Sequence, residues 1–381
     1  MKILRVINSI NPHSGGPIEG LKKASQVMLD ADIEVEVVSL DQASEVQGEV
    51  DAMPWPVYAL GPTKFGVYSY SNQLTPWLKE HLSRFDAVII HGCWQFHGYA
   101  VSKACQKLGK PYYIYPHGML DPWFNQTYPL KKLKKQLYWS WGEHPVLSKA
   151  KAVLFTCEEE RCLARKSFSP YRVREHVIGY GTSIASEADS ASVFTRPTPQ
   201  PYFVFLGRVQ EKKGVDLLVA AYSRLRSEHP EMPDLVIAGP EQQPEYAQSI
   251  KETFPLPSIH WIGPVNSTDK WSLLRQAAAL TLVSHQENFG LVVAEALAMG
   301  TPVLISDKVN IWREIDEAGA GMVGPDTLEG AETILLKWIG QSSSEMAAMQ
   351  RKAKQVFIEH FDIQKATHRL IDFLKLELDQ S

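Results

Sequence analysis

The stretch from Thr281 to Asp307 constrains the fold more than any other part of the chain. Its sequence is TLVSHQENFGLVVAEALAMGTPVLISD, which predicts a strand, a polar loop, a helix, a tight turn and a second strand. The predicted helix follows Gly290, and Gly300 with the next two residues ends it. Apolar strands that alternate with helices are typical of a parallel sheet in an α/β fold.

Two carboxylates lie in this stretch, Glu287 in the predicted loop and Glu295 in the predicted helix. Glu295 is the only polar residue among the nine from Leu291 to Met299, so this helix is expected to be buried. Because burying an ionised carboxylate without partners is costly, Glu295 must face hydrogen-bond donors. We expect those donors in the basic loop that contains Arg208 and Lys213. Paired carboxylates also occur in glycosidases, but the apolar surroundings of Glu295 favour a binding pair over a hydrolytic one.

Length and composition indicate a soluble protein of two domains. The chain has 381 residues, of which 44% are hydrophobic and 22% charged, and its net charge is −4. This charge does not favour nucleic acid as a partner. The amino terminus predicts a first strand rather than a signal peptide, and no apolar run approaches the roughly 18–20 residues of a membrane span. The four cysteines contain no C-x-x-C pair. We therefore expect a cytoplasmic protein with reduced thiols.

The first half of the chain predicts a doubly wound parallel sheet, because a strand at 3–7, a glycine-rich loop, a helix and a strand at 34–40 follow one another. Gly15 and Gly16 precede that helix, where backbone amides can approach a phosphate. A plain connecting loop explains the two glycines equally well, since G-x-G-x-x-G is absent. That absence also disfavours a nicotinamide dehydrogenase.

Two later strands of this half end in a histidine followed by glycine. The strand at 87–91 ends at His91, and the strand at 112–115 leads into Pro116-His117-Gly118. Ligands gather at the carboxyl ends of parallel strands, so His117 is a candidate site residue. His91, His97 and His117 suggest a metal site only weakly, because no carboxylate or cysteine completes a familiar ligand spacing.

The segment 121–143 combines lysines with apolar residues at helical spacing. Leu130, Leu133, Leu137 and Trp141 recur on one predicted face. A basic amphipathic helix of this kind can lie on an anionic membrane or bind an anionic acceptor. A solvated helix that packs through its leucines is an equal alternative. The candidate residues for acceptor or membrane contact are His91, Trp94, His97, Trp123, Lys131, Lys132, Lys134 and Lys135.

The basic loop of the second half of the chain lies directly after the predicted strand at 203–206. Gly207 and Arg208 begin it, and Lys213 and Gly214 precede a predicted helix. Arginine can fork onto phosphate oxygens, and lysine adds a point charge, so the loop suits a diphosphate. The spacing does not match a P-loop, which disfavours ATPase chemistry.

These motifs resemble those of the retaining GT-B glycosyltransferases of the large family four. The resemblance covers essentially the whole chain and is carried by Gly207-Arg208 with Lys213-Gly214, Glu287-Asn-Phe-Gly with Glu295-Ala, Gly300-Thr-Pro-Val-Leu, Pro116-His117-Gly118 and Gly15-Gly16. It implies two Rossmann-like, doubly wound domains that face a cleft. It also implies transfer of a hexose from a nucleotide-diphosphate sugar with retention of configuration, without a cofactor or metal. The D-x-D sequence of Asp30 to Asp32 lies at a predicted turn, in agreement with metal independence.

The resemblance implies a role for individual residues. Arg208 and Lys213 would bind the diphosphate and stabilise the leaving group, and Glu287 would orient the donor sugar. Glu295 would accept hydrogen bonds from the ribose, and His117 would lie against the sugar near the reacting carbon.

Further donor contacts follow from the same resemblance. Gly16 would let its loop close on the phosphates or the acceptor. Backbone amides would be offered to the sugar and phosphates by Asn288, Phe289, Gly290 and Leu291.

The linker is expected in the serine-, alanine- and proline-rich segment 181–201. We predict an acceptor-binding domain over 1–185, a linker over 186–200 and a nucleotide-sugar-binding domain over 201–361. The resemblance adds that a last helix, 362–381, packs back on the first domain.

The expected reaction is transfer to a saccharide or lipid-linked acceptor in bacterial polysaccharide or glycolipid synthesis, from a UDP- or GDP-sugar. A peripheral position on the inner face of the plasma membrane would fit the basic helix. The alternatives are a GT-B enzyme that acts on a small sugar or sugar phosphate, an epimerase on this fold, and a non-enzymatic binding module. The complete set of Arg208, Lys213, Glu287 and Glu295 argues against the last.

Overall fold

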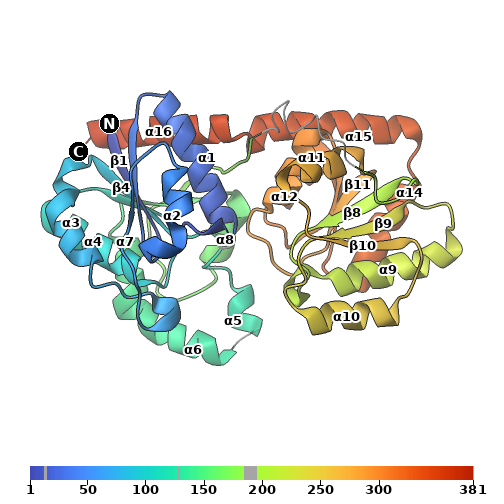
Figure 1. The fold of residues 1–381 in the computed structure, drawn as a ribbon, viewed down its shortest axis with the longest axis horizontal. Helices are drawn as coiled ribbons and strands as arrows, with labels where there is room; N and C mark the ends of the chain where they lie inside the picture. The colour runs from blue at the N-terminus through green and yellow to red at the C-terminus, as the bar shows by residue number, and fades with distance from the viewer. Residues whose placement is uncertain (13–14, 128, 184–194, 381) are drawn as a thin grey trace. The chain divides into compact units, whose positions relative to one another are not determined.

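The computed structural model describes residues 1–12, 15–127, 129–183 and 195–380. The chain divides into two compact units (Figure 1). Met1–Tyr180 and the chain from Ile363 onward form the first, and Gly181–Asp362 forms the second. Of the predicted linker, residues 186–194 lie outside the described residues, and residues 195–200 belong to the second unit.

The first unit is built on a parallel sheet. In its described residues the strand order is β3-β2-β1-β4-β5-β6-β7. Most of these strands are short apolar runs, as expected for a sheet covered on both faces. Their bounds are β1 (Lys2–Ile7), β2 (Glu34–Ser39), β3 (Val57–Ala59), β4 (Ala87–His91), β5 (Tyr112–Tyr115), β6 (Ala152–Phe155) and β7 (Glu175–Val177).

Helices cover both faces of this sheet, and each face has its own hydrophobic core. One core includes residues of α3, α4 and α7, and the other includes residues of α1 and α16. The helices are α1 (Gly16–Asp30), α2 (Ala43–Asp51), α3 (Leu74–His81), α4 (Phe96–Leu108), α5 (Trp123–Thr127), α6 (Pro129–Tyr138), α7 (His144–Ser148), α8 (Glu158–Ala164) and α16 (Ile363–Asp379). Shorter turns are η2 (Gly66–Tyr68), η3 (Leu82–Arg84) and the π-helical η4 (Trp139–Glu143).

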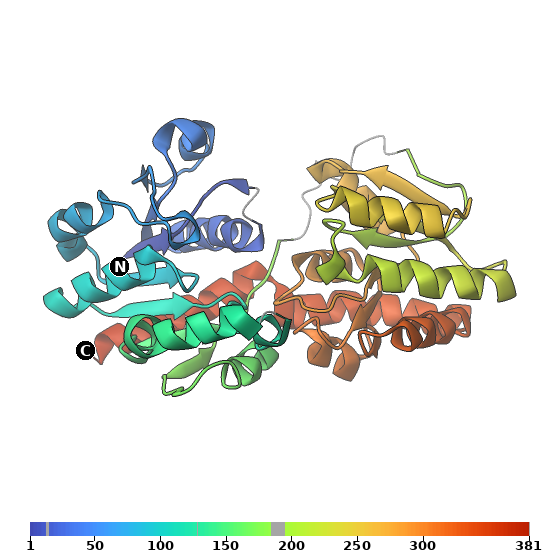
Figure 2. The ribbon, with the colours of Figure 1, turned by 90° about the horizontal axis from the view of Figure 1, so that it is seen from below.

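The last helix, α16, belongs to the first unit although it follows the whole second unit in sequence. It packs beside α1, as Figure 2 shows. Leu370, Ile371 and Leu374 enter the core, because they recur at helical spacing on one face. At the carboxyl end, both guanidinium ends of Arg174 donate to the carboxylate of Glu377, at 2.6 and 2.7 Å.

The second unit repeats the same architecture. Among its described residues the strand order is β10-β9-β8-β11-β12-β13, and all pairs are parallel. Figure 1 shows α11 and α12 on the opposite side of this sheet from α9 and α10. The strands are β8 (Tyr202–Leu206), β9 (Asp234–Ala238), β10 (Ile259–Gly263), β11 (Ala279–Leu282), β12 (Val303–Ser306) and β13 (Gly321–Gly324).

The helices of this unit connect its strands and then continue to the end of the unit. They are α9 (Val215–Glu228), α10 (Pro244–Thr253), α11 (Ser267–Gln276), α12 (Leu291–Met299), α13 (Trp312–Ala318), α14 (Leu328–Ile339) and α15 (Ser343–Val356), with η6 (Glu211–Lys213) and the π-helical η7 (Phe357–Phe361). This pattern of two doubly wound α/β units confirms the predicted fold class. None of the described helices has both the length and the apolar composition needed to cross a membrane.

We predict that Leu374→Ala destabilises the protein by about 2–5 kcal/mol, because it leaves a cavity in the core that contains residues of α1 and α16, where Leu374 is fully buried. The measurement is the midpoint of urea unfolding followed by tryptophan fluorescence. Leu376→Ala is the matched control, since Leu376 lies on the same helix and is 57% exposed. Equal midpoints for the two variants would show that α16 does not stabilise the first unit.

Candidate functional site

The loops after three neighbouring strands of the second unit are joined by backbone hydrogen bonds. The amide of His285, after β11, donates to the carbonyl of Lys212, after β8, at 2.9 Å. The amide of Glu287 donates to Lys308 O, after β12, at 2.9 Å, and Asn310 N donates back to Glu287 O at 3.0 Å. The segment that carries Glu287 is therefore fixed between the two other loops at the carboxyl edge of the sheet.

Lys213 and Glu287 form an ion pair within this edge. Their side chains are 13% and 20% exposed, so the pair is largely removed from water. Burial by itself would raise the pKa of Glu287, but the charges of Lys213, Lys212 and Arg208 outweigh it and lower that pKa. Glu287 is consequently ionised at neutral pH, and it keeps lone pairs that can accept hydrogen bonds.

Arg208 lies in the loop that follows β8, and its side chain is exposed. It forms no ion pair in the described part of the chain, in contrast to Lys213. Gly214 follows Lys213 and caps α9 with a φ of +61°, a conformation that glycine adopts readily. A Cβ at this position would also clash with the carbonyl of Val283. Gly214 thus lets the basic loop pass close to β11.

Glu295 is buried in α12, as its isolated position in an apolar helix predicts. Its partner, however, is not the Arg208–Lys213 loop that we expected. Lys270 Nζ, on α11, donates to Glu295 Oε1 at 2.7 Å, and the same ammonium lies 4.5 Å from the centre of the Trp271 ring. The expected partner is wrong because Lys213 is already held by Glu287.

The segment before α12 places the other predicted donor contacts at the start of that helix. Gly290 caps α12 with a φ of +69°. Phe289 is buried and meets the ring of Phe361 edge to face at 5.7 Å. Asn310 Nδ2 approaches Asn288 Oδ1 at 3.5 Å, and Leu291 is the first helical residue. The amino end of α12, which favours anions, therefore opens beside Glu287.

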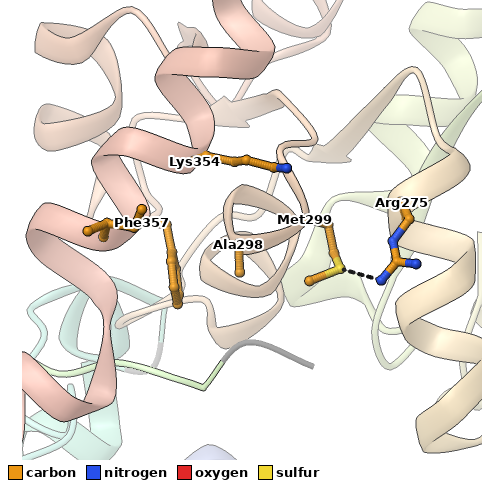
Figure 3. A pocket seen from close by; sticks show the side chains of 6 residues that line it. Arg275, Ala298, Met299, Lys354 and Phe357 are labelled. Atoms are coloured by element: carbon orange, nitrogen blue, oxygen red, sulfur yellow. Dashed lines mark hydrogen bonds between the residues drawn. The ribbon is translucent and has the colours of Figure 1, made fainter. Parts of the chain in front are cut away.

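A separate pocket of about 320 Å³ lies at the other end of α12 (Figure 3). Ala298 and Met299 line it, together with Arg275, Lys354, Phe357 and Ile358. Because Met299 is the last residue of α12 and Gly290 precedes its first, this pocket does not include the predicted donor residues.

In the first unit, His117 lies in a cluster at the carboxyl ends of β4 and β5. Its ring stacks on His91 and Tyr115, with ring centres 5.2 and 5.4 Å away, and meets Tyr180 edge to face. Tyr180 Oη donates to the carbonyl of Gly16 at 3.2 Å. The cluster thus brings together His117 and Gly16, which the sequence singled out separately.

The turn that carries His117 is held by a buried carboxylate that the sequence did not suggest. His117 has a φ of +52°, which is unusual for a residue other than glycine. The next amide, of Gly118, donates to Glu160 Oε1 at 2.6 Å. Thr156 N and Oγ1 donate to the other oxygen at 2.7 and 2.6 Å. Glu160 therefore connects the His117 turn to the end of β6.

Two of the predicted acceptor contacts are buried. His91 is 2% exposed, and His97 is fully buried and donates to His91 O at 2.9 Å. Burial lowers the pKa of His97 to about 4. Both side chains are buried in this conformation, and their contact with the acceptor stays a prediction. Among the described residues no group of three or more histidine, cysteine or acidic side chains is arranged to hold a metal ion.

The other acceptor candidates lie at or near the surface. Trp94 and Trp123 are partly exposed. Lys135 lies over the Trp94 ring at 4.6 Å, and burial lowers its pKa. Lys131, Lys132 and Lys134 are exposed.

The leucines of α6 do not pack into the core. Leu130, Leu133 and Leu137 are 86%, 63% and 67% exposed. The alternative of a solvated helix that packs through its leucines is therefore wrong.

Two family models match the chain in succession. Residues 15–181 match the glycosyl transferase 4-like domain, and residues 187–356 match the glycosyl transferases group 1 model. The chain belongs to the group 1 glycosyltransferases. Together the two models cover nearly the whole length of this GT-B glycosyltransferase, as the sequence resemblance predicts.

Three similar proteins illustrate the range of this family. The GDP-mannose:cellobiosyl-diphosphopolyprenol alpha-mannosyltransferase of Xanthomonas campestris is 25% identical over 98% of this chain and 96% of its own length. The D-inositol 3-phosphate glycosyltransferase of Jonesia denitrificans is 27% identical, over 58% of this chain and only 56% of that protein. The sucrose-phosphate synthase structure from Thermosynechococcus elongatus shares the fold, with a TM-score of 0.77 over 100% of both chains at 14% identity.

Sequence reasoning missed Lys270 and Glu160 as polar partners in this glycosyltransferase. Lys270 precedes Glu295 by 25 positions and lies on a different helix, so no local spacing connects the two. Glu160 is one of three consecutive glutamates, Glu158 to Glu160, and only the fold shows which of them turns inward.

We predict that Lys213→Met lowers turnover on the order of 10²–10³-fold, because the sequence resemblance assigns this cation to the leaving diphosphate, on which negative charge develops. The same change removes the charge that keeps the pKa of Glu287 low, so that pKa rises. The acid limb of the activity profile should therefore move to higher pH. The measurement is kcat as a function of pH. Lys337→Met, an exposed lysine of α14, is the control, and near-normal turnover of Lys213→Met would contradict the assignment.

Proposed function

We propose that this glycosyltransferase is a retaining, metal-independent hexosyltransferase that uses a UDP- or GDP-sugar. The observation that carries the proposal is the Lys213–Glu287 pair beside the exposed Arg208. One edge of a parallel sheet thus offers two cations for a diphosphate and a carboxylate for sugar hydroxyls. The start of α12 adds backbone amides, and Glu295 lies further along the same helix to accept from the ribose.

In the proposed reaction, the bond between the anomeric carbon and the diphosphate oxygen breaks, and a bond to the acceptor oxygen forms on the same face. Negative charge develops on the diphosphate, where Arg208 and Lys213 stabilise it. The proton of the acceptor hydroxyl goes to the leaving phosphate oxygen. Glu287 orients the sugar through its hydroxyls and does not form a covalent intermediate. His117 donates a hydrogen bond to a substrate oxygen.

Metal independence is supported by these cations, which can neutralise a diphosphate as a divalent ion does in other enzymes. The D-x-D sequence lies elsewhere. Asp30 ends α1, and Asp32 has a φ of +57° in the turn before β2. A helix end that leads into a strand is at the opposite edge of a parallel sheet from the loops after the strands.

The acceptor is proposed to be a saccharide carried by a lipid. Support comes from the full-length relative of Xanthomonas campestris, which is named for a diphosphopolyprenol acceptor. It also comes from α6 in the first unit. There, three exposed leucines lie among exposed lysines, and the 69% exposed Trp141 follows in η4. A free sugar or sugar phosphate as acceptor is the alternative that the experiment below separates.

The experiment measures donor hydrolysis and transfer with UDP-, GDP- and ADP-sugars, with and without EDTA. We expect one UDP- or GDP-sugar to be consumed at the same rate in both conditions, because the diphosphate contacts are side chains. NMR of the product should show the anomeric configuration of the donor. Transfer to an extracted polyprenol-linked saccharide should exceed transfer to free sugar phosphates.

Specific outcomes would contradict separate parts of this proposal. Loss of turnover with EDTA, restored by a divalent cation, would remove metal independence. An inverted product would remove the retaining assignment. Faster transfer to sugar phosphates than to the lipid-linked saccharide would favour the alternative acceptor. A Glu287→Gln variant that is as active as wild type would separate Glu287 from the donor site.

We also propose that the protein is cytoplasmic and binds the inner face of the membrane through α6. Next to this helix, Tyr68 contacts Tyr138 edge to face at 6.2 Å. Its turn exposes Phe65 and Val67, which are 76% and 91% accessible. Exposed apolar side chains together with exposed lysines are the composition of an interfacial surface for anionic lipid. Burying this patch would also remove an unusually exposed set of large apolar side chains from water.

We predict that the wild-type protein sediments with vesicles of anionic phospholipid and not with vesicles of phosphatidylcholine. Reversing the three exposed lysines of α6 should abolish this binding. The variant is Lys131→Glu, Lys132→Glu and Lys134→Glu. Each basic residue near an anionic surface is worth about 1 kcal/mol, so the expected loss is more than tenfold.

The matched control has the same change in net charge at exposed lysines that lie outside α6. It combines Lys365→Glu and Lys375→Glu on α16 with Lys337→Glu on α14. If the control and the α6 variant bind vesicles equally, α6 is not the membrane surface.

A further inference from the structure

Arg5 is a cation buried in the middle of β1. It is 1% exposed, and its guanidinium donates to Ser25 Oγ at 2.9 Å, to Leu21 O at 3.1 Å and to His91 Nε2 at 3.2 Å. No carboxylate pairs with it in the described part of the chain. Burial lowers the pKa of Arg5 to about 10, which leaves it protonated at neutral pH. A charge without a counterion in a core is costly, so Arg5 needs an explanation beyond packing.

The direction of the hydrogen bond from Arg5 determines which ring nitrogens of His91 and His117 carry protons. A guanidinium has donors and no acceptor, so Arg5 Nε–H must donate to His91 Nε2. A neutral His91 then carries its single proton on Nδ1. His91 Nδ1 lies 2.9 Å from His117 Nε2, so this proton is donated to His117. His117 in turn must carry its own proton on Nδ1.

Both histidines are neutral in this arrangement. Burial and the Arg5 charge hold the pKa of His91 well below its usual range. The same two causes lower the pKa of His117 to about 3. The rings of His91 and His117 lie nearly parallel, 13° apart, and each also stacks on Tyr115. A His91 ring that turned over would lose both of its ring-nitrogen hydrogen bonds, to Arg5 and to His117.

We propose that Arg5 and His91 are positioning residues that hold His117 in the Nδ1–H form, as a hydrogen-bond donor to a substrate oxygen. The chain of donors runs from a buried cation to a partly exposed imidazole. Its last N–H can donate and cannot accept, so it suits a sugar hydroxyl oxygen or a phosphate oxygen. The identity of the substrate rests on the proposed function, whereas the tautomer of His117 does not.

The first test measures the tautomer directly on the full chain labelled with ¹⁵N-histidine. Long-range ¹H–¹⁵N correlation separates protonated from unprotonated ring nitrogens, and a His117→Asn variant assigns the His117 signals. We expect a protonated Nδ1 and an unprotonated Nε2. In His91→Phe, which retains a ring for stacking, protonation at Nε2 should appear. A wild-type His117 protonated at Nε2, or at both nitrogens, would overturn the proposal.

The second test measures transfer. His91→Phe should lower kcat on the order of 10–100-fold, the range seen when the partner that orients a functional histidine is removed. The KM for the donor should change less. Arg5→Met should act in the same direction, and Arg5→Lys, which retains a cationic donor, should recover part of the loss. If Arg5→Met failed to fold, the test would still stand, because the kcat of His91→Phe is compared with wild type on its own.

The two tests distinguish this inference from the proposed function. If the tautomer shifts in His91→Phe while kcat is unchanged, the proton arrangement is upheld and the role of His117 in transfer is wrong. If kcat falls in His91→Phe without any shift of the tautomer, Arg5 and His91 act by another route and the inference is overturned.

Discussion

A charged side chain buried in or beside a parallel sheet must be matched by hydrogen-bond partners, and both units of this protein are arranged around that requirement. In the second unit the carboxylates of Glu287 and Glu295 lie in or beside an apolar helix, where they are largely removed from water. Each is matched by a lysine from a different element, Lys213 or Lys270. In the first unit the buried cation Arg5 is matched by neutral acceptors only.

The two lysine–glutamate pairs explain how α12 can be both apolar and part of a polar site. The helix is buried along most of its length because it packs between the sheet and helices α11 and α15. Lys270 reaches Glu295 from α11, so the ion pair between them also holds α11 against α12. Lys213 comes from the loop after β8 and fixes that loop to the segment before α12. The Lys213–Glu287 pair therefore connects the ends of two strands that are adjacent in the sheet but distant in sequence, whereas the Lys270–Glu295 pair connects two helices.

Much of this architecture could be predicted from local patterns, and the failures have a common physical cause. The apolar run with a single glutamate correctly predicts a buried helix, and the alternation of strands and helices correctly predicts the fold class. What the sequence could not supply is the partner of Glu295, because helix–helix contacts depend on packing geometry rather than spacing. The leucines of α6 show the same limit, since their periodicity predicts a helix but not whether a core covers it.

Arg5 was not singled out from the sequence, although the pattern around it, one charged residue in an apolar run, is the pattern that identified Glu295. It is the only charged residue within the run from Ile3 to Ile7, just as Glu295 is the only polar residue of its helix. A single charge inside an otherwise apolar element is therefore informative in either kind of element. Its partners remain hidden, because His91 is 86 positions away and reaches Arg5 only once β1 and β4 pair.

The Lys213–Glu287 pair also affects which ligands the proposed donor site can accept. A diphosphate attracts Lys213 away from Glu287, and a largely buried carboxylate would then lose its main partner. In the proposed site, an intact nucleotide sugar would replace that partner, because its hydroxyls would donate to Glu287 while its phosphates bind Lys213. A nucleoside diphosphate without the sugar satisfies only the lysine. With these proposed contacts, the pair would favour the donor over the released nucleotide, because a carboxylate without a partner is costly to desolvate, and no additional contact to the base would be required.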